Sequence, residues 1–132
     1  MDKEICFPAL VINDAKIDRI NYRYLVCDKR YINLGYKNVL IIDSEGYCFD
    51  VQRVVQSGGI SLWYSLKLIG LLVRVKPVLK KPIFVIPLTD FRDRLIEIVK
   101  RHPRNFSSLD SSEPLIERLK RSPTYLDIVN VF

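Results

Sequence analysis

The stretch VLIIDSEGYCFDV, residues 39–51, decides the fold. Two apolar runs flank the sequence DSEG at 43–46. Asp43 suits the first position of a type I turn, and Gly46 can adopt the positive φ that closes a bulged hairpin. Beyond the turn, Tyr47, Phe49 and Val51 alternate with residues of the opposite face, as they do in a strand. We therefore predict a β-hairpin centred on residues 43–46.

Other strands are predicted on both sides of this hairpin. Short apolar or alternating runs end at turn-forming residues, which is the pattern of strands in a sheet. The run IFVI at 83–86 is uniformly apolar, which predicts a strand buried on both faces. The predicted strands cover residues 6–12, 20–27, 29–34, 60–75 and 83–86, and QSGG at 56–59 is the predicted turn before the fourth of these.

The hydrophobic period changes after residue 88, where DFRDRLIEIVKRH predicts an amphipathic helix. Thr89 or Asp90 is the predicted N-cap, and Pro103 ends the helix. Its apolar face consists of residues spaced three or four apart: Phe91, Leu95, Ile98 and Val99.

Two further helical segments complete the chain. Asp110 and Glu113 have the spacing of a capping box for a helix to about residue 121. Ser122 and Pro123 then predict the N-cap and first residue of a last short helix. We predict a single α+β domain over residues 1–132. It has a mainly antiparallel sheet of about five to seven strands (about 5–88) and two or three C-terminal helices (about 90–131) packed on one face.

The positive charge lies in the second half of the chain. The net charge is +6, with eight bases and eight acids in residues 1–66 but thirteen bases and seven acids in residues 67–132. Residues 51–88 contain six bases and no acid. This asymmetry indicates either a solvated sheet face or a surface for an acidic partner, whether protein or nucleic acid.

Side chains that would indicate catalysis are few. The one histidine, His102, follows the first helix, where it suits the C-terminus. Gly58 and Gly59 lack the spacing of a phosphate-binding loop. The cysteines, Cys6, Cys27 and Cys48, form neither a disulfide framework nor a zinc pattern. We therefore expect no enzymatic activity, no cofactor and no metal.

The segment LLVRVKPVLKKPIFVIPL at 71–88 is apolar but does not predict a membrane span. Its longest uncharged run, 82–89, is far shorter than the roughly 20 residues that a spanning helix needs. The N-terminus lacks the basic region of a signal peptide. We expect a cytoplasmic protein with reduced thiols and no membrane partner.

A protein-binding surface is the first functional hypothesis. Bases on predicted strands combine with a tryptophan, a residue type that is frequent in binding hot spots. The alternative is a nucleic-acid-binding sheet over residues 53–81, on which aromatic rings stack with bases beside a phosphate track. No RNP, KH or helix-turn-helix signature is present. The candidate partner-binding residues are Arg53, Trp63, Lys67, Arg74 and Lys76.

The layout of the chain resembles that of small bacterial immunity proteins of contact-dependent growth inhibition or secreted toxin systems. The resemblance runs from about residue 39 to the end, through VLIIDSEGYCFDVQRV, PIFVIPL and TDFRDRLIEIVKRHP. It implies a cytoplasmic inhibitor that binds one toxin domain and blocks its active site or its activation. It carries over no individual residue. Because this chain is basic, the toxin would present an acidic surface or meet the neutral first half.

Overall fold

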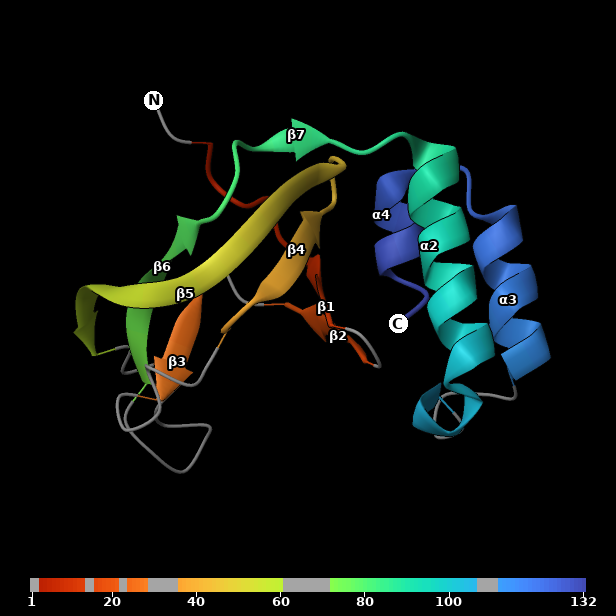
Figure 1. Cartoon of the computed structure of the whole chain (residues 1–132), viewed down its shortest axis with the longest axis horizontal. Helices are drawn as coiled ribbons and strands as arrows, with labels where there is room; N and C mark the ends of the chain where they lie inside the picture. Colours follow the sequence, from red (N-terminus) through yellow and green to blue (C-terminus); the bar gives the residue numbers. More distant parts are fainter. Residues whose placement is uncertain (1–2, 14–15, 22–23, 29–35, 61–71, 107–111) are drawn as a thin grey trace.

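The computed structural model describes residues 3–13, 16–21, 24–28, 36–60, 72–106 and 112–132. In this part of the chain, a curled antiparallel sheet is followed by three α-helices that cover one of its faces (Figure 1). The predicted α+β class is therefore confirmed. The strands are β1 (Ala9–Ile12), β2 (Ile17–Ile20), β3 (Val26–Asp28), β4 (Val39–Asp43), β5 (Tyr47–Ile60), β6 (Leu72–Leu79) and β7 (Phe84–Val85). The helices are α2 (Leu88–Arg101), the 3-10 turn η2 (Pro103–Phe106), α3 (Ser112–Arg121) and α4 (Tyr125–Val129).

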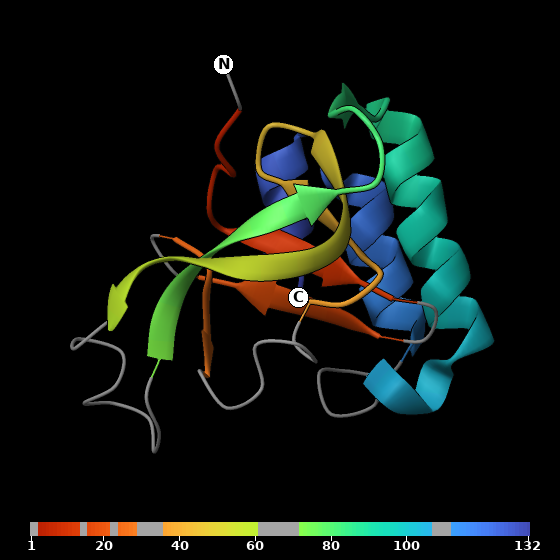
Figure 2. The ribbon, with the colours of Figure 1, turned by 60° about the vertical axis from the view of Figure 1, so that its left-hand side comes forward.

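The strand order explains the curl of the sheet. The order is β2-β1-β4-β5-β6-β3, and β7 pairs with the first residues of β5. β2 and β3 stand at opposite ends of this order, yet only residues 21–25 connect them. A connection of that length spans at most about 20 Å. The sheet therefore bends until its two end strands approach each other, which the turned view in Figure 2 shows.

The sheet has a core on each face. One core lies between the sheet and the helices, where Leu10 and Ile42 meet Phe91 and Leu95. The other fills the inside of the curl. Neighbouring residues of β4 serve different cores, because Ile41 and Ile42 point to opposite faces and both are fully buried.

The predicted hairpin at 39–51 is confirmed. Ile42 pairs with Cys48, and the N–H of Gly46 donates to the carbonyl of Asp43 at 3.1 Å. Gly46 has a φ of 87°, the value for which a glycine is needed. The first helix also has the predicted buried face, formed by Phe91, Leu95 and Val99 together with Ile96; Ile98 is partly buried.

The strand predictions at 20–27, 60–75 and 83–86 and the turn prediction at 56–59 are wrong in position or extent. Residues 20–27 are not one strand, since β2 ends at Ile20 and β3 begins at Val26 on the other end of the sheet. QSGG at 56–59 is not a turn: β5 continues through it to Ile60 with a shift in register. Glycines in a strand permit such a bulge, which bends the strand without ending it.

The strand predicted at 60–75 is also wrong, since Ile60 pairs antiparallel with Val73 and two residues of one continuous strand cannot pair in this way; residues 61–71 lie outside the described part of the chain. The run at 83–86 contains only the two-residue strand β7. Phe84 and Val85 are 48% and 50% exposed, and only Ile86 is buried. β7 pairs only with β5, at an edge of the sheet. The apolar run therefore predicted burial on both faces wrongly.

The helix N-caps differ by two or three residues from those predicted. α2 begins at Leu88 with Pro87 as N-cap, so neither Thr89 nor Asp90 caps it. Thr124, not Ser122, caps α4, and its hydroxyl accepts from the N–H of Asp127 at 3.1 Å. The strand predicted at 29–34 and the start of the capping box at Asp110 lie outside the described residues.

Candidate functional site

Three of the five candidate binding residues share one face of the β5–β6 ribbon. Lys76 pairs with Val55, and directly paired residues project to the same side of a sheet. Arg74 precedes Lys76 by two positions and Arg53 precedes Val55 by two, so both join this side. Arg53, Arg74 and Lys76 are all exposed. We call these three residues the basic face; Trp63 and Lys67 lie outside the described residues.

Arg74 is held in place by an aromatic ring. Its guanidinium carbon lies 4.1 Å from the ring centroid of Tyr24, within cation–π range. A guanidinium that stacks through its face can still donate hydrogen bonds through its edge. The ring contact therefore positions Arg74 and leaves its N–H groups able to donate hydrogen bonds.

A pocket of about 550 Å³ lies beside the basic face. Arg74, Lys76 and Tyr24 line it, together with apolar side chains from the second core. The pairing of β3 with β6 ends near Val75, whose N–H donates to the carbonyl of Leu25 at 3.0 Å. The pocket thus lies where β6 separates from β3, and residues of both sheet faces meet there. The apolar lining consists of Ile5, Phe7, Leu25, Phe49, Val75, Pro77, Leu79 and Ile83.

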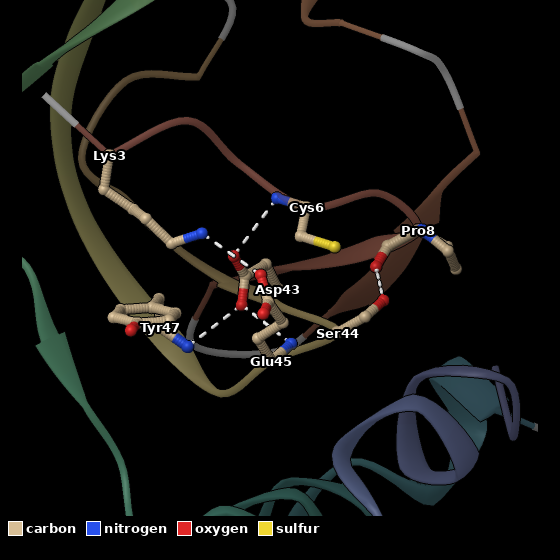
Figure 3. Close-up of polar contacts among 7 residues, drawn as sticks. All are labelled: Lys3, Cys6, Pro8, Asp43, Ser44, Glu45 and Tyr47. Atoms are coloured by element: carbon tan, nitrogen blue, oxygen red, sulfur yellow. Dashed lines mark hydrogen bonds and ion pairs between the residues drawn. The ribbon is translucent and has the colours of Figure 1, made fainter.

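One wall of this pocket is the N-terminal segment, which Asp43 anchors (Figure 3). The Asp43 carboxylate is fully buried and accepts three backbone N–H groups. Cys6 donates to Oδ2 at 3.1 Å, while Glu45 and Tyr47 donate to Oδ1 at 3.0 Å and 2.9 Å. A buried carboxylate is stable only with such donors. Asp43 therefore has a structural role, because it ties the 43–46 turn to the pocket wall.

Lys3, in the same wall, already has a counter-ion. Its Nζ lies 3.1 Å from Oε1 of Glu45 and 4.6 Å from the ring centroid of Tyr47. The hydrogen bond with the Glu45 carboxylate raises the pKa of the Lys3 ammonium group. Arg74 and Lys76 supply the other positive charges at the pocket. The exposed Glu4, which also lines the pocket, adds one negative charge.

Cys48 is buried, Cys6 is partly buried, and His102 is the C-cap residue of α2. Burial raises the pKa of the Cys48 thiol to about 11, so it carries little thiolate at neutral pH. Burial also raises the pKa of Cys6. The backbone N–H of His102 donates to the carbonyl of Ile98 at 3.0 Å, at the C-terminus of α2. Among the described residues, no three His, Cys, Asp or Glu side chains are placed to hold a metal ion.

The chain matches no protein-family model, and no curated protein and no solved structure is significantly similar to it. No helix within the described ranges is long and apolar enough to cross a membrane.

Tyr24 and the N-terminal wall were missed by sequence reasoning. Tyr24 reaches Arg74 because Val26, two residues further along, pairs with Arg74 across β3 and β6. These residues are about fifty positions apart in the chain, and no local pattern indicates their pairing. The alternation in INYRYLVC at 20–27 was the one available signal. It predicted a strand but did not indicate that this strand pairs with β6.

Proposed function

We propose that this protein is a non-enzymatic binding protein that inhibits a bacterial toxin domain in the cytoplasm by covering its surface. The single observation that carries the proposal is the basic face, where Arg53, Arg74 and Lys76 project together from strands that the helices do not cover. Residues 67–87 contain five bases and no acid, and they account for most of the net charge of +6. Such a surface complements an acidic patch on a partner.

The mechanism is occlusion by a prepared surface. The positive potential of the basic face steers an acidic partner and accelerates association, mainly at low salt. Arg74 is already held against Tyr24, so less side-chain entropy is lost when it binds. The choice of a toxin as partner rests on the resemblance in layout.

Nucleic acid is the alternative partner, and the Tyr24–Arg74 stack weighs against it. A base-stacking platform needs an aromatic face that a base can cover. Arg74 occupies one face of Tyr24, which therefore offers that face to no base. A protein partner, which needs the guanidinium edge and not the ring, agrees better with this arrangement.

The proposal is tested by co-expression with the C-terminal domain of the protein that the adjacent upstream gene encodes. We expect this domain to stop growth, wild-type protein to restore it, and R74E/K76E to restore it poorly. The matched control is K16E/K100E, which reverses two exposed bases outside β5 and β6, one directly before β2 and one in α2, and should protect like wild type. An upstream domain without toxicity, or full protection by R74E/K76E together with unchanged complex formation at low salt, would contradict the proposal.

A separate titration addresses the alternative. Generic single- and double-stranded DNA and RNA are titrated at low and moderate salt, and we expect no tight binding. Submicromolar binding with a steep salt dependence would replace the protein partner with nucleic acid.

A further inference from the structure

We propose that the pocket beside β6 binds a small amphiphilic anion, which is a carboxylate carried on an apolar chain. The pocket combines an apolar lining with two basic side chains at one place on the surface. Its volume of about 550 Å³ lies within the roughly 300–1,000 Å³ of typical ligand pockets. This inference goes beyond the proposed toxin partner and does not depend on it.

The lining suits the apolar part of such a ligand. Phe49 and Val75 are 1% and 5% exposed and form a fixed floor, while Leu79 and Ile83 are partly buried. An aliphatic chain that covers the partly buried Leu79 and Ile83 removes their remaining apolar surface, and its own, from water. The Asp43 anchor holds the opposite wall at Ile5 and Phe7, so the pocket is largely formed before binding.

The rim suits the charged part. The Arg74 guanidinium lies over the Tyr24 ring, and a guanidinium can donate two parallel hydrogen bonds to one carboxylate. Lys76, two residues along the same strand, adds a second positive charge. Lys3 contributes less because Glu45 already neutralises it. Glu4 repels an anion, so its removal should strengthen binding.

A small molecule fits these features better than a peptide segment. A peptide would bring backbone N–H and C=O groups against the apolar floor, where they need hydrogen-bond partners. A single carboxylate at the end of an aliphatic chain places its one polar group at the rim and leaves nothing polar over the floor.

The test is a calorimetric titration of the full chain with octanoate, octan-1-ol and butanoate. We expect octanoate to bind more tightly than octanol, because octanol lacks the charge. We also expect octanoate to exceed butanoate by up to about fourfold for each buried methylene. R74Q should weaken octanoate binding by about tenfold, which brings the affinity for octanoate close to that for octanol. E4Q should tighten octanoate binding by about twofold.

Arg53 supplies the matched control. It shares the exposed face with Arg74 but does not line the pocket, so R53Q should leave octanoate affinity unchanged. Thermal unfolding of each variant verifies that it is folded. The proposal is overturned if millimolar octanoate does not bind, if octanoate and octanol bind equally, or if R53Q weakens binding as much as R74Q. It is also overturned if hexaglutamate, which has no apolar chain, competes as well as octanoate. None of these results would alter protection from a toxin domain, so the two proposals can fail separately.

Discussion

The helix-covered part of the sheet and the curled β5–β6 part differ in how their cores are closed. Over β1 and β4, the helices supply fully buried side chains such as Phe91, Leu95 and Leu119. Inside the curl, the sheet packs mainly on itself, and the cover is the N-terminal segment. The pocket beside β6 lies at that second place, with the N-terminal segment as one wall. The two cores are therefore closed by different kinds of cover, helices over one and an irregular segment over the other.

Charge follows the same division. Residues 88–132 contain eight bases and seven acids. Glu97 forms an ion pair with Arg101 within α2, and Glu117 forms one with Lys120 within α3, all four side chains being exposed. Such pairs contribute little stability but keep the surface nearly neutral. Residues 67–87 have no acid to balance their five bases. Four of these bases, Arg74, Lys76, Lys80 and Lys81, are exposed in and just after β6, so unbalanced positive charge lies on that part of the chain.

The largest expected effect tests whether the two cores respond separately. Phe91→Ala removes a fully buried ring under the helices and should lower the free energy of unfolding by about 4 kcal/mol. Phe49→Ala is its counterpart inside the curl, at 1% exposure. Hydrogen exchange should accelerate mainly in α2–α4 for the first variant and in β5–β6 for the second. Uniform acceleration in both would show that the cores act as one.

The next effect concerns Asp43, which connects the hairpin with the pocket wall. Asp43→Ala leaves three backbone N–H groups without their acceptor and should cost about 3 kcal/mol. Amide exchange should increase at residues 3–7. Ser44→Ala, which loses one hydrogen bond to the carbonyl of Pro8, should cost about 1 kcal/mol. Equal losses for the two variants would contradict the anchoring role.

Gly46 lies where the hairpin turn meets α4. A methyl group there would stand 2.6 Å from the Tyr125 ring, and φ is already 87°. Gly46→Ala should therefore cost about 2–3 kcal/mol, from crowding and from backbone strain. Chemical denaturation measures the loss. In the background of Tyr125→Ala the cost should fall to the backbone part alone; an undiminished cost would show that the ring is not the obstacle.

Alkaline pH should weaken the helix-covered core through Cys48. The pKa of this thiol is raised to about 11 in the folded state, so its contribution is complete below about pH 9 and is lost as pH rises toward 11. The loss should be on the order of 2 kcal/mol. Unfolding free energies of Cys48→Ala should decline less steeply over this range. Cys6→Ala, which leaves Cys48 in place, should decline almost as steeply as wild type.

The smallest effect is expected on the basic face. R74E/K76E changes two exposed side chains and removes one cation–π contact, so stability should change by no more than about 1 kcal/mol. Thermal unfolding measures this change. A larger loss would mean that these bases hold the curl together, and it would remove the reason to regard them as a binding surface.

Sequence reasoning succeeded where the deciding interactions are local. The hairpin depends on Asp43 and Gly46, which act within four residues, and α2 depends on spacings of three and four. It failed at 56–59, since glycines that favour a turn also permit a bulge within a strand. It failed again at 83–86, because an apolar run does not reveal whether a second strand will cover it.

The sequence by itself determined that strands precede helices, the turn at 43–46 and the concentration of charge in residues 67–87. These depend on neighbouring residues and on composition. The tertiary structure alone decided that β2 and β3 end the sheet on opposite sides, that Tyr24 lies under Arg74 and that Lys3 is neutralised by Glu45. Each of these depends on strand register between distant segments. Many registers satisfy the same alternation of side chains, and only the packing of both cores together selects one.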